Sequence, residues 1–376
     1  HLRELTMASR DDSADLLPEG LADRLPAAAA AATAVMRDAL DTMHAHGYDR
    51  VSPPLIEFEQ SLANRMSGVG TQRMVRFTDP HSLKTLALRE DITVQLGRIA
   101  STALADTARP LRLCYAGEVV TLTGRQLDPR RQKLQLGAEL IGHDSAAAAA
   151  EIVALAVAAL TAAGARNLTV DFTLPDLVDT LAERALPLAP EQVEPVRREL
   201  DTKDAGGLKA AGGEAYLPLL YAGGPFEEAI EKLAAIDGGG ALATRIAALK
   251  QIAASLDSTA RLTLDPSERH GFEYQSWMGF SVYADGMPGA LARGGTYTIL
   301  GRDEAATGVS LYPDRLIDVL AQHPQAEDIL YLPTGHDRAA ADRLRAEGWR
   351  TRAALGEGED PRKLACTHVL DAGQPR

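Results

Sequence analysis

Two short apolar runs on either side of a turn-rich stretch constrain the fold more than any other part of this chain. The runs are residues 111–116 and 134–141, and the residues between them are rich in Gly, Arg, Asp and Pro. Alternating polarity on both sides of such a stretch predicts an antiparallel pair of strands with a long connecting loop.

The second predicted strand carries polar groups at alternate positions. Gln135, Gly137 and Glu139 are spaced two apart, so they share one face of the strand, and the leucine and alanine residues between them share the other. An amide and a carboxylate with a glycine between them leave room and polarity for a small ligand. An ordinary half-exposed strand has the same pattern, so this strand alone does not decide between the two interpretations.

Composition and charge narrow the class of protein. The 376 residues are enough for two or three domains, each with its own core. The formal net charge of −13 argues against a protein built mainly to hold nucleic acid, because that function needs a basic face. Cys114 and Cys366 lie far apart and have no metal-ligand spacing, which favours the reducing cytoplasm as the compartment.

Neither a targeting signal nor a membrane span is visible in the sequence. The first dozen residues are charged rather than apolar, and Met7 is a candidate natural start, which would make residues 1–6 an addition. The most apolar stretch is residues 152–163. These 12 residues are too few to cross a bilayer and predict a buried helix. We therefore expect no membrane partner.

Local patterns predict both helices and strands along the chain. Pro26 and Gly47 bracket an alanine-rich helix. Two prolines interrupt residues 51–58, which therefore predict an edge or interface strand. Asp91 and Thr93 stand where another helix begins, so helix capping explains either of them as well as ligand binding does. Further helices are predicted at 145–164 and after 308–316, and further strands at 86–88, 168–174, 280–283 and 289–300.

Changes in composition along the chain predict its division into domains. Residues 175–257 are rich in Ala, Leu and Glu and read as a helical insertion, and residues 326–376 have the pattern of a small β-α-β piece. The core would then comprise residues 13–174 and 258–325, with residues 1–12 as a tail.

Familiar motifs for phosphate binding, zinc catalysis, paired-cysteine metal sites and nucleophilic serine hydrolysis are missing from the sequence. Gly294-Gly295 alone is a weak signal. We therefore expect no cofactor and no metal.

Seven stretches occur in the order in which similar stretches occur in the catalytic core of class II aminoacyl-tRNA synthetases. They are LLPEG, SPPLIEF, LALREDIT, YAGEVVTLTGR with RRQKLQLGAELIG, HGFEYQSW, RGGTYTIL and GVSLYPDRL. Together they cover most of residues 13–325 and resemble the histidine enzyme in particular. SPPLIEF resembles the first motif, which lies at that family's dimer interface. The resemblance implies an α+β fold, with an antiparallel sheet flanked by helices, in a homodimer.

Most of the synthetase's catalytic arginines are replaced in this sequence. The positions in the second motif, the histidine loop and the GGRYDGL segment fall on Thr121, His270 and Thr296, while the third-motif arginine is kept as Arg315. Fixed cations stabilise the charge that develops in adenylyl transfer, and losing one such donor costs about two to three orders of magnitude in rate. The resemblance therefore implies no catalytic residue in this chain. Arg269 precedes His270, and a one-residue shift of the match would restore that arginine.

Positions that match the synthetase's histidine contacts are better kept. Carboxylates, amides and hydroxyls accept the hydrogen bonds that an ammonium and an imidazole N–H donate. The resemblance implies histidine-binding roles for Asp91, Thr93, Gln135, Glu139 and Tyr274, with Arg131 as a further candidate. A solvated charge explains Arg131 equally well, and Tyr274 and Tyr297 also fit as core aromatics.

The C-terminal piece departs from the synthetase pattern. The synthetase carries a complete anticodon-binding domain there, whereas residues 327–376 match only part of one. These residues include eight basic and nine acidic side chains, a net charge of −1. They therefore lack the excess of basic residues that a tRNA-binding domain needs.

A synthetase-like body with these changes resembles the regulatory subunit of ATP phosphoribosyltransferase, the enzyme that opens histidine biosynthesis. The resemblance implies a non-catalytic chain that joins the short-form catalytic subunit in a hetero-oligomer, supports its activity and confers feedback by histidine. Two other hypotheses stay open. One is a divergent histidyl-tRNA synthetase that uses other arginines, such as Arg125 or Arg269. The other is a homodimeric amino-acid-binding scaffold with a different partner.

Overall fold

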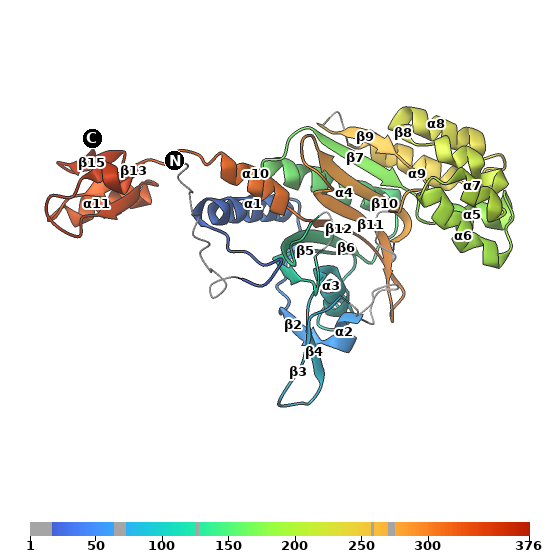
Figure 1. The fold of residues 1–376 in the computed structure, drawn as a ribbon, viewed down its shortest axis with the longest axis horizontal. Helices are drawn as coiled ribbons and strands as arrows, with labels where there is room; N and C mark the ends of the chain where they lie inside the picture. Colours follow the sequence, from blue (N-terminus) through green and yellow to red (C-terminus); the bar gives the residue numbers. More distant parts are fainter. Residues whose placement is uncertain (1–16, 64–72, 125–127, 257–258, 270–274) are drawn as a thin grey trace, which may run out of the picture. The chain divides into compact units, whose positions relative to one another are not determined.

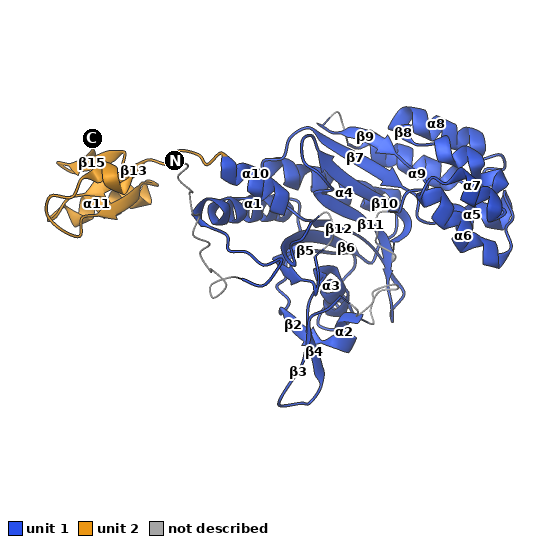
Figure 2. Cartoon of the chain, viewed as in Figure 1, with its two compact units in different colours: residues 1–322 blue, residues 323–376 orange. Residues whose placement is uncertain are grey.

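The chain forms two compact units, residues 1–322 and 323–376 (Figure 2). The computed structural model describes residues 17–63, 73–124, 128–256, 259–269 and 275–376. No helix within these ranges is long and apolar enough to cross a membrane.

A sheet of nine strands forms the centre of the described part of the first unit (Figure 1). Its order is β1-β5-β6-β12-β11-β10-β7-β9-β8. Neighbouring strands are antiparallel except for two parallel pairs, β1 with β5 and β7 with β9. The sheet is therefore mixed and not wholly antiparallel, because long crossovers connect these two pairs and bring the second strand back in the same direction. The strands are β1 (Asp49–Arg50), β5 (Leu111–Val120), β6 (Gln132–Ile141), β7 (Leu168–Thr173), β8 (Gly224–Pro225), β9 (Arg261–Leu264), β10 (Gln275–Ala284), β11 (Ala292–Ile299) and β12 (Glu304–Leu311).

Helices cover both faces of this sheet. On one face, α1 (Pro26–Ala45) packs against α4 (Ala146–Ala162) and α10 (Asp314–Gln322). The aliphatic side chains of β6, from Leu134 to Leu140, are buried in the core that these helices share. On the opposite face, α3 (Ile92–Ser101) packs against β5 and β6. The predicted division of β6 into an apolar and a polar face is confirmed, and the polar face lies on the side of α3.

Capping and turn residues account for the ends of these helices. Pro26 occupies the first turn of α1, and Gly47 follows its end with a φ of +84°, a conformation that glycine adopts without strain. The Ser145 side chain caps α4 by accepting a hydrogen bond from the Ala148 N–H at 3.1 Å. Asp91 caps α3 in the same way, which positions the helix beside the sheet.

A second, three-stranded sheet has the order β2-β4-β3 and contains β2 (Ile56–Phe58), β4 (Thr85–Leu88) and β3 (Arg76–Thr78). β2 lies at its edge, as the prolines before it predict. Next to this sheet lies α2 (Glu59–Ala63), and Leu62, Met74 and Ala87 form a small buried cluster there. Ile56, Phe58 and Phe77 remain 41–44% exposed.

Most of the residues between β7 and β9 are helical, which confirms the predicted secondary structure of this segment. β8 is the exception and joins the edge of the main sheet beside β9. The interpretation of residues 175–257 as an inserted domain stays a prediction. The helices are α5 (Leu177–Arg184), α6 (Pro190–Asp201), α7 (Ala205–Ala210), the 3-10 helix η2 (Glu214–Tyr221), α8 (Phe226–Ile236) and α9 (Ala243–Ala254).

The second unit is a small α/β structure, with the strand order β14-β13-β15-β16. β13 pairs in parallel with both β14 and β15, which confirms the predicted β-α-β arrangement. Alternate residues of β13 enter two small cores, Leu330 and Leu332 in one and Ile329 and Tyr331 in the other. The elements are β13 (Ile329–Leu332), α11 (Arg338–Ala346), β14 (Arg350–Ala353), the 3-10 helix η4 (Pro361–Leu364), β15 (His368–Asp371) and β16 (Gln374–Pro375).

Candidate functional site

A polar pocket lies on the α3 face of the main sheet. The empty space within it, open solvent included, is about 240 Å³. The pocket draws its lining from α3 and from β6, β10, β11 and β12. The lining residues are Thr93, Glu139, Gln275, Arg293, Gly294, Gly295, Tyr297, Gly308, Val309 and Ser310.

Gln135 ties β6 to the start of α3. Its Oε1 accepts a hydrogen bond from the Ile92 N–H at 2.9 Å, and its Nε2 donates to Asp91 Oδ1 at 2.9 Å. The same oxygen of Asp91 accepts the Thr93 N–H at 2.9 Å, so the helix-capping interpretation of Asp91 is confirmed. Capping does not exclude ligand binding, because a carboxylate has further lone pairs to offer.

Hydroxyl groups continue this network beneath the pocket. Gln135 Nε2 also donates to Ser310 Oγ at 2.9 Å. Tyr115 OH lies 3.0 Å from Ser310 Oγ and 3.3 Å from Thr93 Oγ1. We call these residues, together with Glu139 and Tyr297, the pocket network; it consists of Asp91, Thr93, Tyr115, Gln135, Glu139, Tyr297 and Ser310.

Glu139 is the most deeply buried carboxyl of the pocket network, with 1% of its surface exposed. Burial raises its pKa well above the ordinary value, and a hydrogen bond from Tyr297 opposes that rise. The Tyr297 hydroxyl donates to Glu139 Oε2 at 2.6 Å. Burial and the neighbouring Glu139 also raise the pKa of Tyr297. A carboxyl and a phenol in such surroundings can bind a ring N–H, and a cationic ligand would favour the ionised carboxylate.

Two glycines give these side chains room to lie across the sheet. A Cβ atom at Gly308 would fall 1.6 Å from Glu139 Oε2, and one at Gly137 would fall 2.3 Å from Tyr115 OH. At Gly308 only the Glu139 side chain would have to move. At Gly137 the Val309 carbonyl oxygen would also lie 2.4 Å from the Cβ, so both Tyr115 and the backbone of β12 explain this glycine.

Sequence reasoning missed several pocket residues. Arg293 and Gln275 line the pocket, and Ser310 belongs to both its lining and its network. Tyr297 also fits the sequence pattern as a core aromatic, and the structure shows that its hydroxyl contacts Glu139. Polar residues at alternate positions of 292–299 and 304–311 were the available signal, but that signal does not reveal which strands become neighbours.

Arg131 and Thr121 lie where the loop between β5 and β6 closes, and neither lines the pocket. Arg131 Nε donates to the Thr121 carbonyl at 3.2 Å, and its Nη1 donates to the Glu19 carbonyl at 3.4 Å. Thr121 Oγ1 donates to the Thr123 carbonyl at 3.0 Å. The structure therefore brings Asp91, Thr93, Gln135 and Glu139 together in one network, in which Thr93 and Glu139 line the pocket and Asp91 and Gln135 do not. It places Arg131 apart from them.

Thr296 stabilises an irregular part of β10. The register between β10 and β11 shifts between Gln275 and Gly279. There Thr296 Oγ1 accepts hydrogen bonds from the Trp277 N–H at 3.2 Å and the Met278 N–H at 3.1 Å. A buried hydroxyl thus accepts hydrogen bonds from two backbone groups in the irregular part of the ladder.

The remaining predicted positions lie around residues 270–274. His270 and Tyr274 are outside the described residues, as is Arg125 in the other loop. Arg269 is described: its Nη1 pairs with Glu194 Oε1 of α6 at 3.1 Å, and its N–H donates to Asp201 Oδ1 at 2.8 Å. Arg269 therefore contacts the helical segment between β7 and β9.

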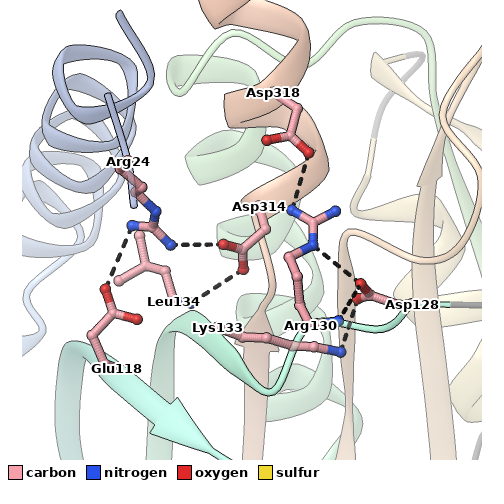
Figure 3. A network of polar contacts seen from close by, with 8 residues as sticks. All are labelled: Arg24, Glu118, Asp128, Arg130, Lys133, Leu134, Asp314 and Asp318. Atoms are coloured by element: carbon pink, nitrogen blue, oxygen red, sulfur yellow. Dashed lines mark hydrogen bonds and ion pairs between the residues drawn. The ribbon is translucent and has the colours of Figure 1, made fainter. Parts of the chain in front are cut away.

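A second polar group surrounds the start of β6 (Figure 3). Arg24 pairs with Asp314 at 2.7 Å and with Glu118 at 3.5 Å, and Asp314 Oδ2 accepts the Leu134 N–H at 3.1 Å. Burial raises the pKa of Asp314, against the opposing charges of Arg24 and Arg130. We call the charged residues of this group the ion cluster; they are Arg24, Glu118, Asp128, Arg130, Lys133, Asp314 and Asp318.

The loop side of the ion cluster is held by one aspartate. Asp128 pairs with Lys133 at 2.8 Å and with Arg130 at 3.1 Å, and Arg130 also reaches Asp318 at 3.0 Å. Burial opposes ionisation of Asp128, but the hydrogen bonds from Lys133 and Arg130 hold its pKa below the ordinary value. Within the described ranges, no group of three or more His, Cys, Asp and Glu residues could hold a metal ion.

Comparison with known proteins identifies relatives over nearly the whole chain. A family model described as histidyl-tRNA synthetase matches residues 20–316. Two curated proteins, from Rhodospirillum centenum and Paramagnetospirillum magneticum, are each 40% identical to this chain and are named ATP phosphoribosyltransferase regulatory subunit. These matches cover 96% and 94% of this chain and 95% and 96% of the relatives.

Solved structures share the fold. One from Bacillus halodurans, described as an ATP phosphoribosyltransferase regulatory subunit/histidyl-tRNA synthetase, has a TM-score of 0.80 at 23% identity and covers 94% of this chain and 97% of that one. Histidyl-tRNA synthetase from Nostoc has a TM-score of 0.76 at 15% identity, with coverage of 93% and 88%.

The predicted class II synthetase-like α+β fold is confirmed by these structures and by the family model. Histidyl-tRNA synthetases and the regulatory subunits share this fold. The relatives that are 40% identical decide between these two families, because both are named as regulatory subunits and match nearly the full length of the chain. The chain therefore belongs to the family of ATP phosphoribosyltransferase regulatory subunits.

Proposed function

We propose that this chain binds histidine in the pocket and reports its occupancy to a short-form ATP phosphoribosyltransferase catalytic subunit. The observation that carries the proposal is the buried Glu139–Tyr297 pair, which faces a pocket beside the Asp91–Gln135 contact at the start of α3. The family to which the chain belongs indicates ATP phosphoribosyltransferase as the regulated enzyme. The pocket is the proposed binding site for histidine, the regulator.

Histidine suits this pocket because the two groups of acceptors match its two cationic ends. Asp91, Gln135 and Thr93 offer oxygen atoms to an α-ammonium. Glu139 and Tyr297 offer a carboxyl and a phenol to an imidazole N–H. Tyr274 completes the proposed set by resemblance, and Arg131, which contacts loop carbonyls, would act only by positioning that loop.

A binding experiment tests the pocket. Asp91→Asn keeps a good helix cap but removes the charge, so it separates ligand binding from folding better than alanine does. Losing a charge-assisted hydrogen bond costs about 1.5–3 kcal/mol, and we expect calorimetry to show histidine affinity at least about tenfold lower in Asp91→Asn and in Glu139→Ala. Unchanged affinity in both variants would show that histidine does not bind here.

We further propose that the chain does not form histidyl-adenylate. Threonines stand at two positions that hold arginines in the synthetase, and both hydroxyls are engaged in local hydrogen bonds. Neither can supply a fixed positive charge to a developing phosphoryl transition state. Histidine-dependent exchange of pyrophosphate into ATP well above a blank would instead support the divergent synthetase, which the matching family model and the retained Arg315 favour.

Regulation requires that histidine bind one arrangement of the complex better than another. Typical coupling free energies are about 1–3 kcal/mol, which moves an inhibition curve by roughly 5- to 150-fold. The experiment mixes the purified chain with a short-form catalytic subunit and follows product formation from ATP and phosphoribosyl pyrophosphate during a histidine titration. We expect co-elution, a change in rate and histidine inhibition that weakens in Asp91→Asn.

The outcomes of this experiment separate the hypotheses. A catalytic subunit that neither co-elutes nor responds would exclude the regulatory function and leave a histidine-binding scaffold with another partner. Inhibition that Asp91→Asn does not change would move the regulatory histidine to a different site. No tRNA partner is proposed, since the second unit carries no net positive charge.

Self-association is proposed through the three-stranded sheet. Phe58 and Phe77 both face Leu86 of the strand between them, and Ile56 faces Leu88, so these side chains share one face of the sheet. Three of them stay exposed, which is costly for an isolated chain and typical of an interface. Phe58→Glu should convert a dimer to a monomer in light scattering, while Tyr221→Glu, at a position 75% exposed, should not.

A further inference from the structure

We infer that Arg293 is the cation that holds the carboxylate of the amino-acid ligand. This assignment rests on the proposed function of the pocket as an amino-acid site and deepens it. Arg293 lies outside every position that the resemblance to the synthetase assigns to histidine binding.

The sheet register places Arg293 beside the pocket network. Arg293 on β11 is paired with Ser310 on β12, and Ser310 is paired with Gly137 on β6. Neighbouring strands lie about 4.8 Å apart, so the Arg293 backbone is roughly 10 Å from β6. Side chains alternate along β11, so Arg293 faces the same side as Tyr297. An amino acid held at Glu139 and Tyr297 is therefore within reach of its guanidinium.

The charges of the pocket lining then match a zwitterion. Glu139 and Tyr297 are acceptors at one end, and among the described lining residues Arg293 is the only lysine or arginine. A guanidinium stays charged at any ordinary pH and binds a carboxylate through two parallel hydrogen bonds. A ligand with a carboxylate at one end and an imidazole at the other satisfies both groups.

Arg269, which stands just before the histidine-loop stretch, contacts α6 and is not among the described residues that line the pocket. Arg269 pairs with Glu194 and donates its N–H to Asp201, both on α6. Bringing its side chain to the pocket would break the pair with Glu194. Arg293 is already in the lining, on a central strand whose backbone pairs on both sides hold it in position.

A comparison of two ligands tests this assignment. Histidinol carries a hydroxymethyl group in place of the carboxylate and keeps the ammonium and the imidazole. We expect the wild-type chain to bind histidine at least about tenfold tighter than histidinol, since only histidine can make the charge-assisted pair. Arg293→Gln should remove this preference by weakening histidine binding about 10- to 100-fold while leaving histidinol affinity within twofold. Arg293→Lys should restore part of it.

The control variant is Arg302→Gln, at an exposed arginine in the turn after β11, which should leave both affinities unchanged. Equal weakening of histidine and histidinol in Arg293→Gln would show a structural role and overturn the assignment. Histidine affinity equal to wild type in Arg293→Gln would also overturn it, with the pocket itself still standing. If the glutamine variant does not fold, the histidine-to-histidinol ratio in Arg293→Lys decides. A wild-type chain that binds neither ligand would refute the proposed function and this inference with it.

Discussion

Two neighbouring stretches of β6 carry polar groups of different kinds. At Gln135 and Glu139 the pocket network is buried and consists mainly of hydrogen bonds among amide, hydroxyl and carboxyl groups. At Lys133 and Leu134, which directly precede Gln135, the ion cluster consists of paired charges, several of them at least partly exposed. Each charged side chain of the ion cluster has an ion-pair partner within the cluster, although Glu118 Oε2 is buried without a hydrogen bond, whereas four members of the pocket network line an open space. We therefore assign ligand binding to the pocket network and the fixing of loops to the ion cluster.

The largest expected effect comes from filling the space under Glu139. In Gly308→Ala the added Cβ would fall 1.6 Å from Glu139 Oε2, so the buried Glu139 carboxyl must leave its present position. Displacing Glu139 should abolish measurable histidine binding, and overpacking should lower the unfolding free energy by about 1–3 kcal/mol or more. Calorimetry and urea unfolding measure the two effects.

Gly97→Ala is the matched control for this change. Gly97 lies inside α3, and its nearest neighbour would be 3.5 Å from the new Cβ. Alanine there should stabilise the helix by about 0.5–1 kcal/mol. Normal histidine affinity in Gly308→Ala would contradict the placement of the ligand over Glu139.

Asp314→Ala should break the ion cluster while leaving the pocket network in place. The Asp314 side chain is only 10% exposed, and its loss leaves Arg24 and the Leu134 N–H without this partner. Removing one member of a buried pair typically costs about 3–5 kcal/mol, and we expect the lower end because Arg24 is partly exposed. Urea unfolding should show this loss, with histidine affinity in the folded variant within a few-fold of wild type. A fall in affinity as large as that of Glu139→Ala would mean that the two networks act as one.

The raised pKa of Glu139 predicts a distinctive pH dependence. Between its unfolded pKa, about 4.3, and the higher folded value, the folded chain binds more protons than the unfolded chain, so stability falls as pH rises. The slope from this group reaches about 1.4 kcal/mol per pH unit. Glu139→Gln removes this contribution, so its stability relative to wild type should increase with pH above about 4.3. Glu228→Gln, at an exposed position on α8, should keep the wild-type profile. A constant difference between Glu139→Gln and wild type would mean that Glu139 titrates normally.

The smallest expected effect belongs to the rim of the ion cluster. Asp318 is 56% exposed, and Figure 3 shows its ion pair with Arg130. Asp318→Ala should cost no more than about 1 kcal/mol at low salt, because solvent screens such pairs. At about 1 M salt the difference should vanish, since the screening length falls to about 3 Å. A loss that persists in high salt would place Asp318 among the buried members of the cluster.

The sequence predicts local features of this site well and long-range ones poorly. Asp91 stands before an apolar helix, and Gln135 and Glu139 lie at alternate positions of a strand. The helix cap at Asp91 and the shared face of Gln135 and Glu139 therefore follow from local periodicity. Arg293 and Ser310 lie more than 150 residues after Gln135, and only strand order makes them its neighbours. Alternation fixes the face of a side chain but not the strand beside it. The role of Thr296 depends on an irregular register, which residue patterns do not specify.

The hydroxyl of Thr296 also bears on how this chain relates to enzymes of the same fold. The Trp277 and Met278 N–H groups both donate to it, so arginine at this position would leave two buried donors without their present acceptor. An unsatisfied buried donor costs about 1–3 kcal/mol, a sizeable share of the about 5–15 kcal/mol that keeps a typical domain folded. Thr296→Arg is therefore expected to destabilise this chain unless other residues around β10 change with it.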